Sequence, residues 1–314
     1  MAIVTVAYGV AAVSVLLAVA IYRLQLPRGS MASLPGEPPA GDEMVHLQAS
    51  AGPTRYRLSP GSGRLVVLVP GISYPMELYD GLFKTIKAAG RAVLMYDVTG
   101  RGFSHSSGEK MTADLYVRQL VELLEATGHR ESEVDLVGWS MGSIIVTHMA
   151  DRLPHRVARL VLLAPVGGMA PNRPWTANLI HLPMGLGPAL ATLVMSGTLK
   201  KLYRNELGDG RLSQFLCDHV SRNPALTRAI VSTLADCTEL DDNRKVLKSV
   251  GLNQRPVLVL WGSGDGTISR ANIDSIMGLL PFATLEVFKG AGHAFFVLEV
   301  AYEANARVVE FLRD

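Results

Sequence analysis

The chain has 314 residues, of which 18% are charged, and its formal net charge is +2. This length allows one large buried core, so we expect a single main domain with an insertion. The near-balanced charge and the lack of clustered lysines and arginines argue against a nucleic-acid interface, and we expect no nucleic-acid partner.

The two cysteines, Cys217 and Cys237, are too few for a disulfide framework. We interpret both as thiols and leave a single bridge between them open. The sequence has no Cys-x-x-Cys and no closely spaced pair of histidines, which are the usual ligand patterns of a zinc site. It also lacks a Gly-rich phosphate loop followed by Lys and Ser or Thr. We therefore expect neither a metal nor another cofactor.

The N-terminal segment, residues 2–22, contains no charged residue. About twenty helical residues at about 1.5 Å each span roughly 30 Å, the thickness of the hydrocarbon core of a bilayer. We predict a single-pass transmembrane anchor over residues 1–26. Arg23 and Arg28 follow the apolar run, so the positive-inside tendency predicts that the rest of the chain is cytosolic. The alternative is a secreted protein whose signal is cleaved after residues 18–20, although no Lys or Arg precedes the apolar run.

Residues 27–43 are rich in Pro, Gly and Ser and are predicted to be a linker. The main domain is then expected over residues 44–314. Alternating apolar residues at 44–49 and 54–58 predict an antiparallel pair of strands at its start.

Beyond residue 64, nearly continuous apolar segments alternate with amphipathic ones. The apolar segments predict buried strands at residues 64–69, 92–96, 134–137, 158–163 and 256–261, and a last strand at residues 283–288. The amphipathic segments predict helices at residues 76–89, 112–127, 143–152 and 295–312. This alternation predicts the α/β class, with a mostly parallel central sheet and helices on both faces.

The strand-and-helix alternation breaks between residues 164 and 256. That interval contains helix-like segments at 189–203 and 225–237 and no obvious strand. We predict a helical lid insertion at about residues 166–250, placed over the carboxyl ends of the strands, where open α/β sheets bind ligands. Its apolar residues are expected either to face a lipid-like substrate or to pack inward on the domain.

The sequence Gly138-Trp139-Ser140-Met141-Gly142 lies between a predicted strand and a predicted helix. A serine at a sharp strand-to-helix turn is typical of a nucleophile elbow, and the flanking glycines let strand and helix approach each other. The first N–H groups of a helix have no partner within it, so the N–H of Met141 is a candidate oxyanion donor. We predict that Ser140 is a catalytic nucleophile.

Together with the strand order, this elbow resembles the α/β-hydrolase superfamily over residues 44–314. The resemblance implies that a catalytic acid and a histidine follow late strands, in the order serine, acid, histidine. Asp265 and His293 occur at those places. His293 would then exchange a proton with Ser140 and the leaving group, and Asp265 would orient the imidazole.

The same resemblance implies a second oxyanion donor, the N–H of Ile72, in the loop after residues 64–69. This chain has Pro70-Gly71 where most relatives have His-Gly, which leaves open whether Ser73 or Tyr74 contributes a side chain. The turn at 97–104 resembles a family turn in which the aspartate, here Asp97, makes local hydrogen bonds.

The order of membrane segment, linker and elbow resembles the monoacylglycerol-lipase type of serine hydrolase. It implies hydrolysis of a carboxylic ester, either a small-molecule or a lipid-like ester, through an acyl-enzyme. A carbon–carbon bond hydrolase, a thioesterase and an acyltransferase use the same three residues and remain alternatives. A non-catalytic ligand-binding protein is a further alternative. The oligomeric state is not predicted.

Overall fold

The computed structural model describes residues 41–47, 52–105, 108–169, 186–298 and 300–313. Eight strands form one sheet in the order β1-β2-β4-β3-β5-β6-β7-β8. The strands are β1 (Glu43–Leu47), β2 (Gly52–Ser59), β3 (Ser62–Val69), β4 (Arg91–Tyr96), β5 (Val134–Trp139), β6 (Val157–Leu163), β7 (Val257–Gly262) and β8 (Ala283–Phe288). β2 is antiparallel to both β1 and β4, and all other neighbours are parallel. The predicted mostly parallel sheet is confirmed.

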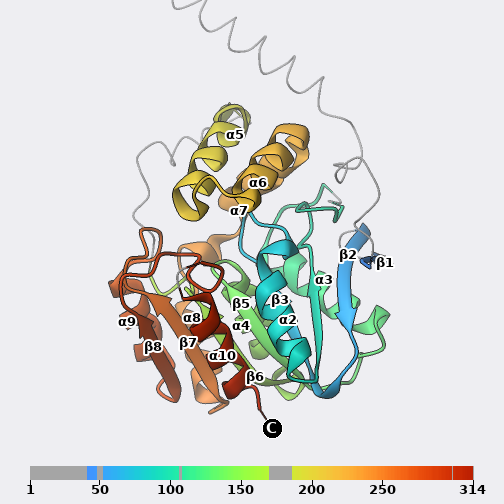
Figure 1. The fold of residues 1–314 in the computed structure, drawn as a ribbon, viewed down its shortest axis with the longest axis vertical. Coiled ribbons are helices and arrows are strands. Elements are labelled where there is room, and N and C mark those ends of the chain that lie inside the picture. The colour runs from blue at the N-terminus through green and yellow to red at the C-terminus, as the bar shows by residue number, and fades with distance from the viewer. Residues whose placement is uncertain (1–40, 48–51, 106–107, 170–185, 299, 314) are drawn as a thin grey trace, which may run out of the picture.

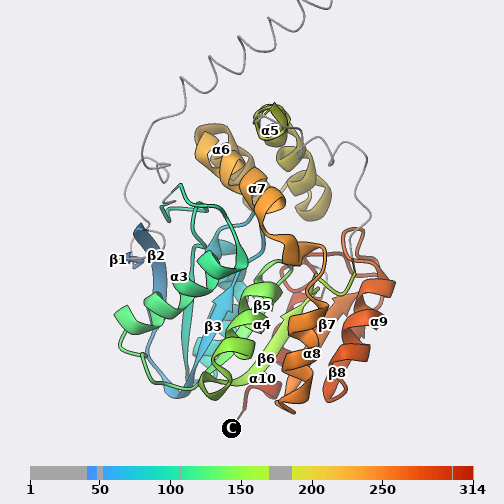
Figure 2. The ribbon, with the colours of Figure 1, turned by 180° about the vertical axis from the view of Figure 1, so that it is seen from behind.

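Helices cover both faces of this sheet. The face in front in Figure 1 carries α2 (Asp80–Ala88) and α10 (Ala301–Phe311). The opposite face, in front in Figure 2, carries α3 (Ala113–Ala126), α4 (Gly142–Arg152), α8 (Arg244–Leu252) and α9 (Arg270–Leu279). Two apolar clusters fill the two interfaces between sheet and helices. All six residues of β5 and of β7 are buried, which is why these strands have nearly continuous apolar sequences.

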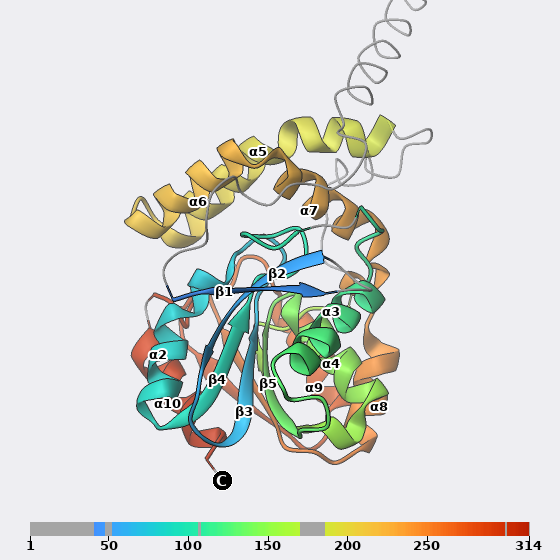
Figure 3. The ribbon, with the colours of Figure 1, turned by 90° about the vertical axis from the view of Figure 1, so that its right-hand side faces the viewer.

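Three helices from the interval between β6 and β7 form the predicted helical lid. They are α5 (Leu186–Leu207), α6 (Arg211–Arg222) and α7 (Pro224–Asp236). Figure 3 shows them above the end of the sheet where the parallel strands end. Buried lid residues such as Tyr203 and Leu216 belong to the same apolar cluster as Trp139, the residue before Ser140. The lid is therefore packed onto the end of the sheet that carries the candidate site.

Two predicted helices differ from those in the structure. The segment predicted as one helix over 76–89 is a short 3₁₀ helix, η1 (Met76–Tyr79), followed directly by α2. The closing helix was predicted from residue 295, and that start was wrong because α10 begins at Ala301. Phe295 and Phe296 lie in turns before α10, where both rings are buried in the core. Their apolar character reflects this packing and not a helical face.

No helix among the residues that the structure describes is long and apolar enough to span a membrane. The predicted anchor at residues 1–26 lies outside the described residues, as does the linker up to residue 40. Cys217 and Cys237 are both buried free thiols, so no bridge joins them.

Candidate active site

Ser140 lies between the last residue of β5 and Met141, the N-cap of α4. Its φ of 52° is in the left-handed region, which non-glycine residues rarely adopt. Its N–H donates to the main-chain oxygen of Leu163 on β6 at 2.9 Å, so the neighbouring strand holds the turn. A serine in a strained, sheet-supported turn is the arrangement that the sequence analysis predicted at the elbow.

The glycines of the elbow are required by close backbone approach. A Cβ at Gly138 would lie 2.5 Å from the main-chain oxygen of Gly142, and one at Gly142 would lie 2.2 Å from that of Val69. A Cβ at Gly71 would lie 2.8 Å from the Trp139 ring and 3.4 Å from the Cβ of Ser140. The loop after β3 therefore packs directly against the nucleophile elbow.

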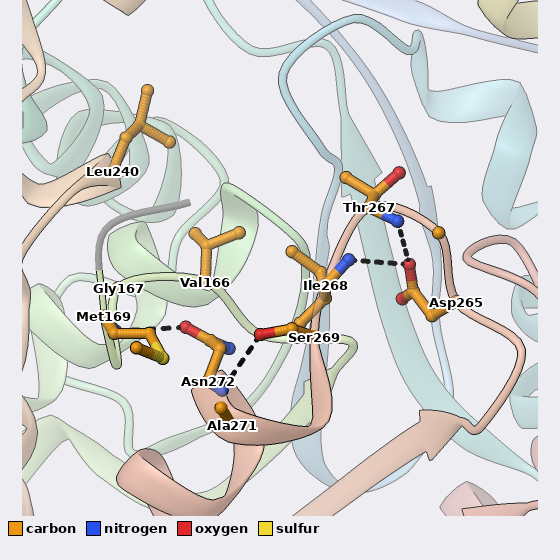
Figure 4. Close-up of a pocket in the computed structure, with 11 residues that line it drawn as sticks. Val166, Gly167, Met169, Leu240, Asp265, Thr267, Ile268, Ser269, Ala271 and Asn272 are labelled. Carbon is orange, nitrogen blue, oxygen red and sulfur yellow. Dashed lines mark hydrogen bonds between the residues drawn. The ribbon is translucent and has the colours of Figure 1, made fainter. Parts of the chain in front are cut away.

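Asp265 and His293 are joined by a hydrogen bond of 2.7 Å between Oδ2 and Nδ1. The other carboxylate oxygen of Asp265 accepts the N–H groups of Thr267 and Ile268 at 2.7 and 2.8 Å, which fixes the side chain (Figure 4). Asp265 comes from the loop after β7 and His293 from the loop after β8. Because β7 and β8 are parallel neighbours, their ends bring both loops to the same edge of the sheet.

The pKa of His293 reflects opposing effects. Burial lowers it, but the hydrogen bond to Asp265, the charge of that carboxylate and the charge of Glu206 together raise it above the ordinary value. The imidazole is thus prepared to accept a proton and to hold the resulting charge.

Trp139 connects His293 to the elbow. Its ring centroid lies 5.0 Å from that of His293, and its Nε1–H donates to the main-chain oxygen of His293 at 3.2 Å. Ser140 and His293 are both nearly buried, and each has 7% of its surface exposed. The structure therefore gathers the three predicted catalytic residues in one place, whereas their catalytic roles stay predictions.

Of the two predicted oxyanion donors, Met141 follows Ser140 in the elbow as the N-cap of α4, and Ile72 lies in the loop after β3. Within the described parts of the chain, neither main-chain N–H donates a hydrogen bond. Both groups are therefore free to bind an oxygen that develops negative charge. We call residues 70–74 the candidate oxyanion loop.

Lid and core residues hold the candidate oxyanion loop. Nε–H of the buried Arg101 donates a hydrogen bond of 2.9 Å to the main-chain oxygen of Ile72. The same guanidinium donates to the hydroxyl of Thr233 on α7 at 2.5 Å. The main-chain oxygen of Ser73 accepts the hydroxyl of Tyr203 on α5 at 2.6 Å. Neither Arg101 nor Tyr203 was singled out from the sequence, because nothing in the local pattern marks a residue whose partner lies on a distant element.

Ser143 was also not singled out from the sequence. Its hydroxyl donates to the main-chain oxygen of Ser140 at 2.6 Å and accepts the N–H of Val166 at 3.2 Å. It therefore joins the elbow to the loop after β6.

Asp97 has a wider role than the local one that was predicted. One oxygen accepts the N–H of Phe103 at 2.9 Å, as expected for a turn aspartate, but the other accepts the N–H of Met76 at 2.8 Å. The guanidinium of the buried Arg55 lies 3.2 Å away. Burial raises the pKa of Asp97 to about 7, and Arg55 opposes that effect. Asp97 therefore joins its turn to η1 and to β2.

A cavity of about 360 Å³ lies beside the loop after β7, which carries Asp265. Asp265 lines it together with both apolar and polar residues from three segments, and neither Ser140 nor His293 is among its lining residues. Figure 4 shows Asn272 at one side of this cavity, where its amide oxygen accepts the N–H groups of Gly168 and Met169. The cavity therefore lies next to Asp265 and not over Ser140.

A serine in a strained strand-to-helix turn, beside an Asp–His pair at the end of a parallel sheet, defines a hydrolase of the α/β class. Comparison with known proteins agrees with that class. The model of the alpha/beta hydrolase family matches residues 66–311, and the chain belongs to this family.

Three individual proteins that resemble this chain share a third or less of the aligned residues with it. The chain is 32% identical to the pimeloyl-[acyl-carrier protein] methyl ester esterase of Aromatoleum aromaticum, over 51% of this chain and 66% of that protein. It is 24% identical to a probable lysophospholipase L2 of Haemophilus influenzae, over 80% and 82%. A solved esterase from Exiguobacterium antarcticum shares the fold, with a TM-score of 0.68, 18% identity and coverage of 83% and 96%. Some curated relatives are much longer than the part that matches. The chain covers 66%, 12% and 66% of the length of three of them.

Proposed function

We propose that this protein is a serine hydrolase that cleaves carboxylic esters through Ser140, His293 and Asp265. The observation that carries the proposal is the 2.7 Å hydrogen bond from His293 to the buried Asp265 carboxylate, beside the strained turn at Ser140. In a serine hydrolase the carboxylate holds the imidazole in one tautomer, which leaves the other ring nitrogen to serve the nucleophile.

The reaction proceeds in two halves. Nε2 of His293 takes the proton of Ser140 as the serine oxygen attacks the ester carbonyl carbon, and the N–H groups of Met141 and Ile72 bind the oxyanion. When the tetrahedral intermediate collapses, the ester bond breaks and the alcohol leaves with the proton from His293. Water then attacks the acyl-enzyme with His293 as base, releasing the acid and restoring Ser140.

The proposed substrates are uncharged, lipid-like esters of the monoacylglycerol type. On α5, Leu190 and Val194 are one turn apart and are 42% and 65% exposed, so the lid presents apolar side chains to the surroundings. The relatives named as a methyl ester esterase and a probable lysophospholipase support ester and lipid-ester chemistry.

We also propose that residues 1–26 anchor the protein in a membrane, with a cytosolic catalytic domain. The uncharged run at residues 2–22, followed by Arg23 and Arg28, supports this arrangement. Carbonate extraction of membranes and the intact mass of the expressed chain test it. Retention in the membrane at full mass supports an anchor, and loss of the first twenty or so residues with secretion contradicts it.

The central experiment uses the full chain and its Ser140→Ala variant with acetyl to palmitoyl esters and with monoacylglycerols, and measures released acid. Release by the parent and not by the variant supports serine hydrolysis, and preference for long neutral chains supports the lipid-like substrate. Labelling of Ser140 by a fluorophosphonate without release of acid from any ester contradicts ester hydrolysis and favours one of the alternatives. Adding a glycerol or thiol acceptor to the same assay separates hydrolysis from acyl transfer.

A further inference from the structure

Glu206, near the C-terminal end of the lid helix α5, connects the lid to both sides of the candidate active site. Its Oε2 accepts the hydroxyl of Tyr74, in the candidate oxyanion loop, at 2.5 Å. Its Oε1 accepts the hydroxyl of Thr267, two residues after Asp265, at 3.3 Å. A single carboxylate from the lid therefore bridges the loop after β3 and the loop after β7.

Tyr74 places this carboxylate close to the nucleophile. The Tyr74 ring lies between Trp139, at a centroid distance of 4.8 Å, and Tyr203, at 5.1 Å. Trp139 immediately precedes Ser140 and contacts His293. Burial, followed by the charge of Glu206, raises the pKa of Tyr74, so the hydroxyl stays protonated and donates to the carboxylate.

The charges around the site are unevenly distributed. Asp265 is already paired with His293, and Glu206 adds a second negative charge that also acts on His293. Arg101 is a cation that contacts the candidate oxyanion loop. It is fully buried and directs its N–H groups to Ile72, Thr99 and Thr233. Glu206 is half-buried and Arg101 is fully buried, so Glu206 is the more exposed of these two charges.

We propose that Glu206 is a specificity-determining residue that disfavours esters carrying a negative charge near the scissile bond. This inference rests on the proposed ester hydrolysis. It gives a physical reason why the site disfavours anionic esters, and it predicts that cationic esters are not disfavoured. The physical basis is Coulomb repulsion across a partly desolvated site. At a separation on the order of 10 Å, a unit charge changes the rate for a charged substrate by about 5-fold.

The experiment compares three six-carbon 4-nitrophenyl esters with the full chain. They are the neutral hexanoate, the anionic half ester of adipic acid and the cationic 6-aminohexanoate. In the Glu206→Gln variant, which keeps an amide oxygen to accept from Tyr74, we expect kcat/KM to rise about 5-fold for the anionic ester and to fall about 5-fold for the cationic one. The neutral ester should change less than about 2-fold, because no charge interaction is lost.

Two further variants separate charge from structure. Tyr74→Phe removes the 2.5 Å hydrogen bond and keeps the carboxylate, so the ratio of anionic to neutral rates should not change. Asp218→Asn removes a carboxylate of the same lid from an exposed position on α6, and it should leave all three rates unchanged. A second readout is the pH profile, in which Glu206→Gln should move the acid limb to lower pH because the charge of Glu206 raises the pKa of His293.

The outcomes distinguish this proposal from the function on which it rests. Hydrolysis of the neutral ester that is lost in Ser140→Ala, with an unchanged anionic-to-neutral ratio in Glu206→Gln, overturns the role of Glu206 alone. An equal change for all three esters also overturns it, since that result indicates a structural role. If the parent hydrolyses none of them, the proposed function fails and this inference fails with it. Should Glu206→Gln not fold, salt applied to the parent tests the same charge, because screening should raise the anionic-to-neutral ratio.

Discussion

The hydroxyl of Tyr203, on the lid helix α5, donates a hydrogen bond of 2.6 Å to the main-chain oxygen of Ser73, the residue after Ile72. Both partners are buried. Together with the bond from Arg101 to Ile72, this contact holds two successive carbonyl groups of the candidate oxyanion loop. The position of a proposed oxyanion donor therefore depends on a helix that begins more than one hundred residues later in the chain.

Replacing Tyr203 with Phe tests this dependence. The ring that packs against Tyr74 remains, and only the hydroxyl is lost. We expect the free energy of unfolding to fall by about 1 kcal/mol, the net value of one hydrogen bond. Because the oxyanion loop loses a restraint, kcat for a neutral ester should fall about 10-fold, less than the loss from deleting an oxyanion donor outright, and KM should change little. Tyr302→Phe, at a position 90% exposed on α10, is the matched control and should behave like the parent.

Replacing Asp265 with Asn tests the orienting role of the carboxylate. The amide has nearly the same shape, but it cannot both accept from the N–H groups of Thr267 and Ile268 and stabilise a charged His293. We expect kcat to fall by about 10⁴-fold, as when a triad aspartate is replaced and the histidine adopts the wrong tautomer. Esterase assays together with circular dichroism check this. A folded variant with at least a tenth of the parental kcat would contradict the assignment of Asp265.

The pH dependence of activity follows from His293. Its pKa is raised above the ordinary value of 6.5, and the imidazole must be neutral to accept the proton of Ser140. Activity is therefore lost as pH falls through this pKa, and kcat/KM for a neutral ester should have its half-maximal point above pH 6.5. A profile over pH 5 to about 9 measures that point. An acid limb centred below the ordinary histidine value would show that the Asp265 interaction does not dominate burial.

Gly142→Ala tests the close packing of the elbow. The new Cβ would lie 2.2 Å from the main-chain oxygen of Val69, and backbone atoms cannot move aside as a flexible side chain can. We expect the free energy of unfolding to fall by about 2 to 3 kcal/mol in urea denaturation. Gly197→Ala is the matched control, because no atom lies within 4 Å of its added Cβ on α5. That variant should be unchanged or up to about 1 kcal/mol more stable. Equal effects at the two positions would argue against the tight turn.

Much of the fold was predictable because its signals are local. Parallel strands that are buried on both faces need continuous apolar segments, and the covering helices need an amphipathic period. The strands β3 to β7 were located to within a few residues for this reason, and the partly exposed edge strand β8 was also located. The start of α10 was wrong because Phe295 and Phe296 are apolar for packing in turns, and hydropathy alone does not separate that case from a helix.

The sequence by itself determined the elbow around Ser140 and the positions of Asp265 and His293 relative to late strands, because each depends on a short motif next to a strand end. Only the tertiary structure decided how Glu206 meets Tyr74, 132 residues away, and how Tyr203 and Arg101 hold the oxyanion loop. These contacts join elements distant in sequence and depend on how the lid packs across the end of the sheet. No local periodicity carries that information, since a carboxylate at the end of a lid helix has the same sequence signature whether it faces solvent or hydrogen-bonds to loops below the lid.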